Sequence, residues 1–477
     1  MMTIVRSLLD LSAGAVLLYF LILAAVYLVL MLISAWSVSS GVLSASAVED
    51  EFVKNLPVLP PVSLIVPAYN EEKCIVDTVR SLLKLNYPAT EIIVVDDGST
   101  DGTLQELITT FDLQPVSLVY RSCVQAKVPT QMYWSSTPGQ NLLVLHKVNG
   151  GKPDALNAGL NMARSPYFCT VDADTVVDPD GLRHLMAPIV RSKKPVIVST
   201  GVVRTLNGSS VVDGKIDSRD LPNSWLGLCQ TIEYMRNFLL GRPAWSELNA
   251  TLICSGAFCL IDRNRAVEVG GFSGATVTED TELIARMHRI LPKPFSMAYT
   301  PATVCWTQAP HSLGDLGRQR RRWQLGLIQT VLLHHSGVFN PRCGAFGMIS
   351  LPFHAFLEMA GAAVEFFGVA LVLLAGIFGL ISQECFFVFL AFSIAYGTLI
   401  SMAAIFLHTF APQPYFRVRD LCKLTLYAFL ENFGYRQVVA LFKCWAILQA
   451  VTGTTKEWGK PARLRMSGPK DMRSTAA

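Results

Sequence analysis

Charged residues are scarce in this chain: Asp, Glu, Lys and Arg make up 16% of its 477 residues, whereas soluble domains carry roughly a quarter. None of its 11 cysteines falls in a C-x-x-C pair or at metal-ligand spacing, so we expect reduced thiols packed as small apolar side chains. The G-x-x-x-x-G-K-S/T phosphate-binding motif is absent, and so are internal repeats. These absences exclude an ordinary soluble protein, a P-loop nucleotidase and a cysteine-rich metal site.

Hydrophobic residues are abundant instead, at 51%, and they gather in long runs. The run Leu11–Trp36 carries no charge and is about as long as a bilayer is thick. Because it has no signal-peptide cleavage pattern, we interpret it as a retained transmembrane helix. Further spans are predicted at Ala362–Leu380 and Cys385–His408. The stretch Leu421–Val451 contains too many charges for a span and is interpreted as two amphipathic helices at the membrane interface.

The basic residues predict the orientation in the membrane. They cluster at Arg318–Arg322, at Arg417 and Arg419, and at Lys456–Arg465, while the loop 382–384 has none. By the positive-inside rule, the middle of the chain and its C-terminus face the cytoplasm, and the protein lies in the plasma or inner membrane. We therefore predict five parts: an N-terminal transmembrane helix at 1–40, a cytoplasmic domain at 60–310, amphipathic interfacial helices at 311–345, transmembrane and interfacial helices at 346–450, and a cytoplasmic C-terminal segment at 451–477.

Strands and helices alternate in the cytoplasmic part, which predicts an α/β domain with a mostly parallel sheet. Short apolar strands are predicted at Val62–Val66 and Ile92–Val95, with a helix at Glu72–Leu85 between them. Ligands bind outside the carboxyl ends of the strands in such sheets, so polar residues at strand ends are expected to line one site. Three strands end in this way, at Tyr69–Asn70–Glu71, at Asp96–Asp97 and at Asp172–Asp174.

Two aspartates, Asp172 and Asp174, follow the apolar strand "PYFCTV". Carboxylates at i and i+2 of an extended segment point the same way, and together they can hold Mg²⁺ or Mn²⁺ with positions open for phosphate oxygens. Asp97 is predicted to accept a hydrogen bond from a nucleobase. Lys152 stands at a glycine-rich helix N-terminus, which suits anions. The alternatives are ordinary turn chemistry for the aspartates and a solvated surface position for the lysine.

Two adjacent carboxylates, Glu279 and Asp280, stand at the start of an amphipathic helix in "TVTEDTELIARMHRI". Capping explains part of this pattern, because Thr278 is a good N-cap residue and acids suit the first turn of a helix. Whether one of the two carboxylates also reacts has to be decided by the rest of the chain.

A basic helix is predicted in "RQRRRWQLGLIQTVLLHH", where Gln319, Arg322 and Trp323 share one face at i, i+3 and i+4. On that face Arg322 could bind a phosphate with two guanidinium nitrogens, and Trp323 could stack on a sugar ring. The alternative is a basic helix that only lies on the membrane surface. Both interpretations can hold for one helix.

The motifs "VDDGSTD", "DAD", "TED" and "QRRRW" occur in this order, and the set resembles the family 2 glycosyltransferases with a D, D, D, Q-x-x-R-W signature. The chain looks most similar to the membrane-embedded synthases of cellulose, hyaluronan, chitin and poly-N-acetylglucosamine. The resemblance spans 62–327 by motif. It implies an α/β GT-A-type nucleotide-sugar-binding domain inserted between transmembrane and interfacial helices. It is specific for the fold and the reaction class but not for the sugar.

The resemblance also implies roles for individual residues. Asp280 would be the general base, with Glu279 capping or orienting. The remaining roles would be donor nucleotide binding by Tyr69, Glu71, Asp97, Lys152 and Asp172, metal binding by Asp172 and Asp174, diphosphate and acceptor binding by Gln319, Arg322 and Trp323, an acceptor-side wall at Cys254–Phe258, and a gating loop with Thr455, Lys456 and Trp458. A plain polar tail is the alternative for that last segment.

The expected reaction is an inverting, Mg²⁺- or Mn²⁺-dependent polymerisation of an NDP-sugar, followed by extrusion of the polysaccharide. The resemblance in chain size and in the "SGAF…TED" spacing to poly-N-acetylglucosamine and chitin synthases favours UDP-GlcNAc. With three spans, extrusion requires the interfacial helices to help build a channel, or a small partner subunit or second copy to complete it. One alternative is a non-processive enzyme that glycosylates a lipid, as ceramide glucosyltransferases do. Another is a transporter or scaffold with an inactive domain, which the complete set of acids disfavours.

Overall fold

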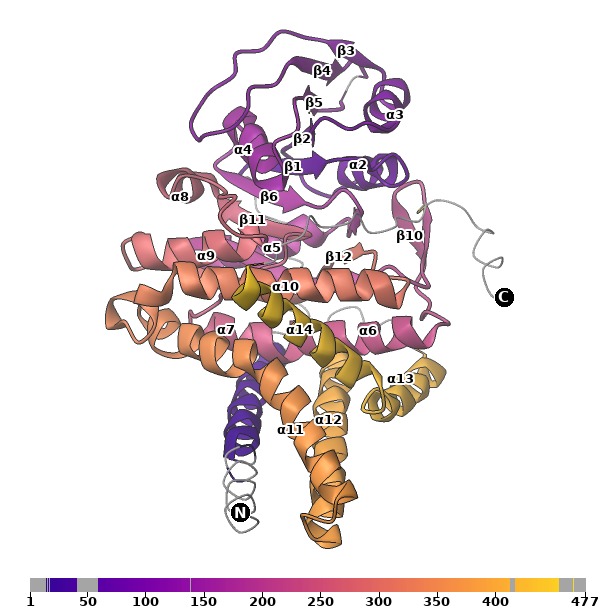
Figure 1. Cartoon of the computed structure of the whole chain (residues 1–477). Coiled ribbons are helices and arrows are strands. Elements are labelled where there is room, and N and C mark those ends of the chain that lie inside the picture. The colour runs from indigo at the N-terminus through magenta and orange to yellow at the C-terminus, as the bar shows by residue number, and fades with distance from the viewer. Residues whose placement is uncertain are drawn as a thin grey trace.

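The computed structural model describes residues 14, 16, 18–40, 59–137, 139–411, 417–453 and 466. The predicted gating residues Thr455, Lys456 and Trp458 lie outside the described residues. Figure 1 shows three levels: a sheet with its covering helices at the top, a layer of crossing helices in the middle, and long helices that extend downward.

A ten-stranded sheet forms the centre of the upper level. In spatial order its described strands are β3 (Leu113–Pro115), β4 (Gln131–Ser135), β5 (Leu142–His146), β2 (Thr90–Asp96), β1 (Val62–Ala68), β6 (Tyr167–Val171), β11 (Phe258–Asp262), β8 (Val196–Thr205), β12 (Ser296–Thr307) and β7 (Thr175–Val177). The short strands β9 (Ser210–Val212) and β10 (Lys215–Ser218) pair separately.

The sheet is mixed rather than mostly parallel, and the prediction is correct mainly for four neighbouring strands at its centre. Strands β5, β2, β1 and β6 are parallel neighbours, but β11 is antiparallel to both β6 and β8, and β7 is antiparallel to β12. An antiparallel strand needs no crossover back to the same end of the sheet. The chain therefore enters β11 at the end where it leaves β6, with Phe258 opposite Val171. This brings the segment before β11 to the edge where the acidic residues lie.

Helices cover both faces of the sheet, so its central strands are buried on both sides. In β1, Val62, Leu64 and Val66 pack in one apolar core while Ile65 packs in the other. A strand buried on both faces is continuously apolar, as β1 and β2 are. The covering helices are α2 (Ile75–Leu83), α3 (Thr103–Thr110), α4 (Lys152–Met162), α5 (Gly181–Arg191), α8 (Arg263–Glu268) and α9 (Glu279–Ile290).

The middle level consists of helices that cross beneath the sheet (Figure 1). They are α6 (Trp225–Arg236), η1 (Asn237–Gly241), α7 (Arg242–Glu247), α10 (Leu313–Leu333), η2 (His335–Gly337), η3 (Pro341–Cys343), α13 (Val418–Leu430) and α14 (Tyr435–Thr452). The two helices predicted in 421–451 are thus present as α13 and α14. Their charges do not all face an interface, however, because Glu431 is fully buried and binds Arg236, Arg436 and Ser401.

Three helices in the described part of the chain are long and apolar enough to cross a membrane: Leu18–Ser40, Phe346–Ile377 and Phe386–Phe410. The second is built from η4 (Phe346–Ser350), η5 (Phe353–Met359) and α11 (Ala360–Ile377), and the third lies within α12 (Gln383–Phe410). They overlap the three spans predicted from hydropathy; the second begins earlier than predicted, and the predicted start of the first lies outside the described residues.

Candidate active site

The polar strand ends meet because β2, β1 and β6 are neighbours in the sheet. Their parallel alignment brings their carboxyl ends to one edge, where Tyr69–Glu71, Asp97 and Asp172–Asp174 follow them. The expected juxtaposition of these three segments is therefore confirmed. The antiparallel β11 adds a fourth segment to the same edge, since the backbone N–H of Asp172 donates to the carbonyl of Ala257 at 3.3 Å.

The buried carboxylate of Asp97 organises the glycine turn before α4. The backbone N–H groups of Gly150 and Gly151 donate to it at 3.0 and 2.8 Å. The fully buried ammonium of Lys147 also binds it, and the same ammonium lies 2.6 Å from Asp154. A carboxylate accepts about four hydrogen bonds. Three donors already bind Asp97, which leaves about one position for a further donor such as a nucleobase N–H.

Lys152, the first residue of α4, connects the two acidic motifs. Its ammonium lies 2.7 Å from the Asp172 carboxylate and 3.0 Å from the Glu279 carboxylate. Burial disfavours the charged amine, but Asp172, Glu279 and Asp280 outweigh it and raise the pKa of Lys152. Lys152 is therefore a charged residue of the site rather than a solvated surface lysine.

The carboxylate of Asp280 is held at the N-terminus of α9. Its Oδ2 accepts from the backbone N–H of Gly256 at 3.0 Å, and its Oδ1 accepts from that of Thr281 at 2.8 Å. Burial and the neighbouring charge of Glu279 raise the pKa of Asp280, against the opposing charge of Lys152. Thr278 occupies the N-cap position, but its side chain makes no capping hydrogen bond. Capping therefore explains the "TED" motif less well than its sequence suggests.

Gln319, Arg322 and Trp323 lie on α10 and line the same cavity as Asp280, which brings the predicted base and the predicted acceptor motif together. Arg322 is exposed and forms no hydrogen bond or ion pair with another residue in the described ranges, so its guanidinium is available to a ligand. The other arginines of the motif are engaged: Arg318 with Asp315, Arg320 with Glu233 and Gln319, and Arg321 with the carbonyl of Gly317.

A cavity of about 1040 Å³ joins these groups to the membrane-spanning helices. Its inner part is lined by Lys152, Asp172, Asp174, Asp280, Arg322 and Trp323, and its outer part by Phe20, Leu23, Val372, Leu373, Phe386 and Phe389. The cavity therefore continues from the sheet edge, past the crossing helices, to the level of the spans.

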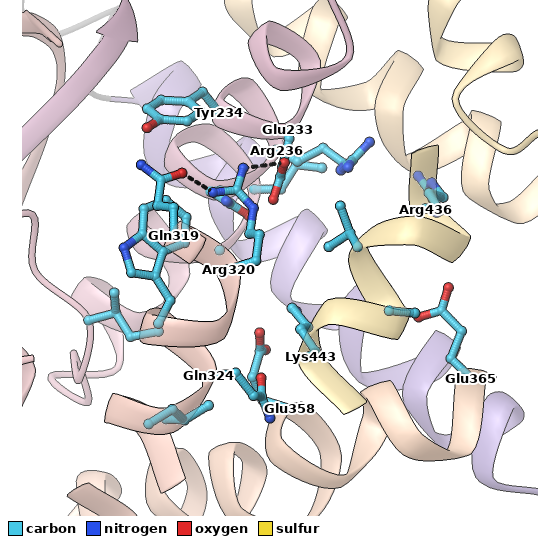
Figure 2. A pocket seen from close by; sticks show the side chains of 18 of the residues that line it. Glu233, Tyr234, Arg236, Gln319, Arg320, Gln324, Glu358, Glu365, Arg436 and Lys443 are labelled. Carbon is cyan, nitrogen blue, oxygen red and sulfur yellow. Dashed lines mark hydrogen bonds and ion pairs between the residues drawn. The ribbon is translucent and has the colours of Figure 1, made fainter. Parts of the chain in front are cut away.

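Charged side chains line the cavity between these two ends. Figure 2 shows Glu358 and Glu365 on the second spanning helix opposite Lys443 and Arg436 on α14. Ionisable side chains in a membrane segment are costly unless they face water or a partner. Their position, in the lining of the cavity and opposite basic side chains, meets this requirement.

The family model described as "Glycosyltransferase like family 2" matches residues 60–326, which is more than half of the chain. The chain belongs to this family. The matched stretch begins just before β1 and ends within α10, so it contains the four motifs and the sheet that carries them.

The family 2 chain also resembles curated proteins over its central part. It is 30% identical over 274 residues to the poly-beta-1,6-N-acetyl-D-glucosamine synthase of Staphylococcus epidermidis, a match that covers 57% of this chain and 55% of that protein. It is 28% identical over 278 residues to the protein of the same name in Staphylococcus aureus strain COL, covering 58% and 57%. The chain thus spans about half the length of the curated relatives it matches.

Among solved structures, a mannosyltransferase from Pyrobaculum calidifontis in complex with GDP-Man and Mn²⁺ aligns with a TM-score of 0.52. The alignment covers 90% of this chain and 99% of that one at 18% identity. At this identity the likeness concerns the fold alone, and it confirms the GT-A-type architecture expected from the motifs.

The pair Asp172 and Asp174 fits a divalent metal that is shared with a substrate. Both residues line the cavity, and they offer carboxylate oxygens, the donors that Mg²⁺ and Mn²⁺ prefer. Within the described ranges, no group of three or more His, Cys, Asp or Glu residues could hold a metal by itself.

The structure also contains site residues that motif reading missed. Lys147 holds Asp97, Gly256 donates to Asp280, and Glu233 binds Arg320 from α6. Of these, only Gly256 had a signal in the sequence, because it lies in the segment "CSGAF". Tyr69, Glu71 and Asp97 lie at the same sheet edge but are not among the residues that line this cavity.

Proposed function

We propose that the protein is an inverting, metal-dependent membrane glycosyltransferase that polymerises N-acetylglucosamine from UDP-GlcNAc and extrudes the product. One observation carries the proposal: a single cavity connects Asp280 and the "DAD" carboxylates to the membrane-spanning helices. The matches to two poly-N-acetylglucosamine synthases support the sugar and the polymerisation.

Asp280 is assigned the role of general base. A sugar hydroxyl is a poor nucleophile, and a carboxylate hydrogen-bonded to it accepts its proton as the bond to the anomeric carbon forms. The bond between that carbon and the diphosphate breaks in the same step, and the nucleoside diphosphate leaves from the opposite face. One displacement of this kind inverts the anomeric centre. Gly256 and Thr281 hold the base in position, and its raised pKa suits proton transfer.

Positive charge for the leaving diphosphate comes from Lys152 and Arg322. Lys152 is kept charged by its acidic neighbours, and Arg322 is exposed to the cavity without a protein partner among the described residues. Such preorganised charges stabilise the negative charge that develops as the bond breaks. Mg²⁺ or Mn²⁺ bound by Asp172 and Asp174 would add Lewis-acid stabilisation of the same diphosphate. The Mn²⁺ bound to the Pyrobaculum mannosyltransferase is consistent with this assignment.

Extrusion is assigned to the continuation of the cavity between the helices. The charged lining formed by Glu358, Glu365 and Lys443 offers hydrogen bonds to the hydroxyl groups of a sugar chain. The basic clusters near α10 and α13 support a cytoplasmic location for the catalytic domain. The proposed route runs from the cytoplasm towards the opposite side of the membrane.

A second function is favoured by the outer end of the cavity. There the lining is apolar, with Phe20, Leu23, Leu373 and Phe389, and such a wall suits a hydrocarbon tail. A non-processive enzyme that transfers one sugar to a lipid would use this surface to hold its acceptor.

A panel of NDP-sugars, offered singly with Mn²⁺ to the purified full chain in nanodiscs, separates the two functions. Release of UDP from UDP-GlcNAc together with a high-molecular-weight product would support the polymerase. Release that requires added lipid and yields one sugar per lipid would replace it with the second function. Asp280→Asn is the matched control, and we expect turnover about 10²- to 10⁴-fold lower with unchanged UDP affinity. If this variant turns over like the wild type, Asp280 is not the base.

A further inference from the structure

Arg320 lies at the centre of the acceptor motif, although it is not one of the signature residues. Its side chain is only 1% exposed, and it is among the largest fully buried side chains in the molecule. Figure 2 shows it between Gln319 and Glu233, with dashed lines to both. The contrast with Arg322, which is exposed two residues later, indicates that the two arginines serve different purposes.

Arg320 contacts Gln319 and Trp323, two of the three signature residues on its own helix. Its guanidinium lies over the ring of Trp323, 4.4 Å from the ring centroid, and donates a hydrogen bond to the side-chain oxygen of Gln319. Arginine can only donate, so the amide oxygen of Gln319 has to face it. The two N–H donors of Gln319 are then left for oxygen atoms of a ligand.

Two side chains from other helices hold Arg320. Glu233 of α6 accepts from it at 2.7 Å, and the hydroxyl of Tyr435, the first residue of α14, donates to the same carboxylate oxygen. Burial favours the neutral acid, but Arg320 and Tyr435 outweigh it and lower the pKa of Glu233. The carboxylate and the guanidinium thus form a charged pair that bridges α6, α10 and α14.

We propose that Arg320, held by Glu233 and Tyr435, is a positioning residue for the acceptor: it fixes the Trp323 ring and the Gln319 amide toward the sugar. The inference rests on the proposed function, because it takes the α10 face as the acceptor site. A planar guanidinium is needed for this role, since it stacks on an indole and donates in two directions at once. Lysine in its place keeps the charge but loses the stacking plane and the second fixed donor.

Arg320→Lys tests the proposal by separating acceptor binding from donor binding. In the full chain in nanodiscs we would measure the acceptor concentration for half-maximal transfer, using N-acetylglucosamine oligosaccharides at saturating UDP-GlcNAc. UDP affinity and the slow hydrolysis of UDP-GlcNAc by water would be measured in parallel. We expect the half-maximal acceptor concentration to rise about tenfold, the order expected when a partly buried cation–π contact and an oriented hydrogen bond are lost. UDP affinity and hydrolysis should stay within about twofold.

Arg321→Lys is the matched control, because Arg321 is the next arginine on α10 and donates a hydrogen bond to the carbonyl of Gly317 on its own helix. Tyr435→Phe removes the hydroxyl that donates to the Glu233 carboxylate. It should also raise the half-maximal acceptor concentration, by a smaller factor than Arg320→Lys. It also keeps the test decisive if Arg320→Lys does not fold.

Three outcomes would overturn the inference. The first is a half-maximal acceptor concentration in Arg320→Lys equal to that in Arg321→Lys. The second is a parallel loss of UDP affinity and hydrolysis in Arg320→Lys. The third applies when Arg320→Lys is unfolded: an unchanged half-maximal acceptor concentration in Tyr435→Phe. A wild-type protein that glycosylates only lipid would refute the polymerase. The role of Arg320 would then be judged by comparing the half-maximal lipid concentrations of Arg320→Lys and Arg321→Lys.

Discussion

Replacing Gly256 with alanine tests whether the carboxylate of Asp280, the proposed general base, has to be held in one place. A methyl group added at Gly256 would lie 3.1 Å from the Oδ2 of Asp280 and 3.4 Å from the ammonium of Lys152. The glycine does not adopt the left-handed conformation, so alanine adds no backbone strain there. The substitution also preserves the backbone N–H that Asp280 accepts. Its effect is therefore steric and is directed at the two charged groups of the site.

The size of the effect follows from the distances. A contact of 3.1 Å between a methyl carbon and an oxygen is a few tenths of an ångström too short. Asp280 is less free to yield than the long side chain of Lys152, because Thr281 holds its other oxygen at 2.8 Å. A misplacement of 1 Å costs about 100-fold in rate, so roughly 0.3 Å costs about fourfold. In free energy of activation this is about 0.8 kcal/mol.

The assay is the initial rate of UDP release at saturating UDP-GlcNAc and acceptor, with UDP affinity measured by titration calorimetry. We expect Gly256→Ala to lower kcat about three- to tenfold and to leave UDP affinity unchanged. Gly274→Ala is the control, because no heavy atom lies within 4 Å of a methyl group at that glycine. If Gly256→Ala retains the kcat of Gly274→Ala, the position of Asp280 does not limit the reaction and the steric reasoning is wrong.

Four further predictions concern the same cavity. Asp280 acts as a base only when deprotonated, so kcat/KM should fall as pH drops through its raised pKa, at a pH above the usual range of aspartate near 3.9. Glu279→Gln removes a charge that raises this pKa and should move the acidic limb of the pH profile to lower pH; a shift to higher pH would contradict the assignment. Asp174→Asn should reduce UDP affinity in Mn²⁺ to the value measured with EDTA, and a full Mn²⁺ response in this variant would remove Asp174 from the metal site. Glu365→Leu should leave hydrolysis of UDP-GlcNAc intact but yield shorter polymer on a sizing gel, whereas wild-type lengths would separate this residue from the extrusion route.

The local features of this chain follow from short-range patterns. Apolar runs of about 20 residues with few or no charges are long enough to cross a membrane as helices, so the three spans were predictable. The apolar stretch 62–68 marks a strand buried on both faces. The i, i+3, i+4 spacing of Gln319, Arg322 and Trp323 places them on one helical face wherever that helix lies. Each of these rules depends on residues less than about 25 positions apart.

The mixed character of the sheet was not predictable in the same way. The turn Asp172–Asp174 leads directly from β6 into β7 without a helix. Strand β11, which follows the crossing helices, begins beside the carboxyl end of β6 and runs antiparallel to it. Strand direction there depends on pairing between segments that are far apart in the sequence, such as β11 with β6 and β8. Alternation of strands and helices predicts parallel neighbours only where every crossover returns to the same end.

The amino-acid sequence by itself determined the class of this protein: a family 2 domain between membrane helices, with an ordered set of acids and one arginine-rich helix. Its buried charge pairs were decided by the tertiary structure alone. Lys147 and Asp97 are 50 residues apart in sequence, and Arg320 and Glu233 are 87 apart. A buried charge is tolerated only beside its partner, and local periodicity carries no information about a partner at that separation. The same reason explains why the signature identified Arg322, the arginine left for a ligand, while only the fold revealed Arg320, the arginine that holds the motif in place.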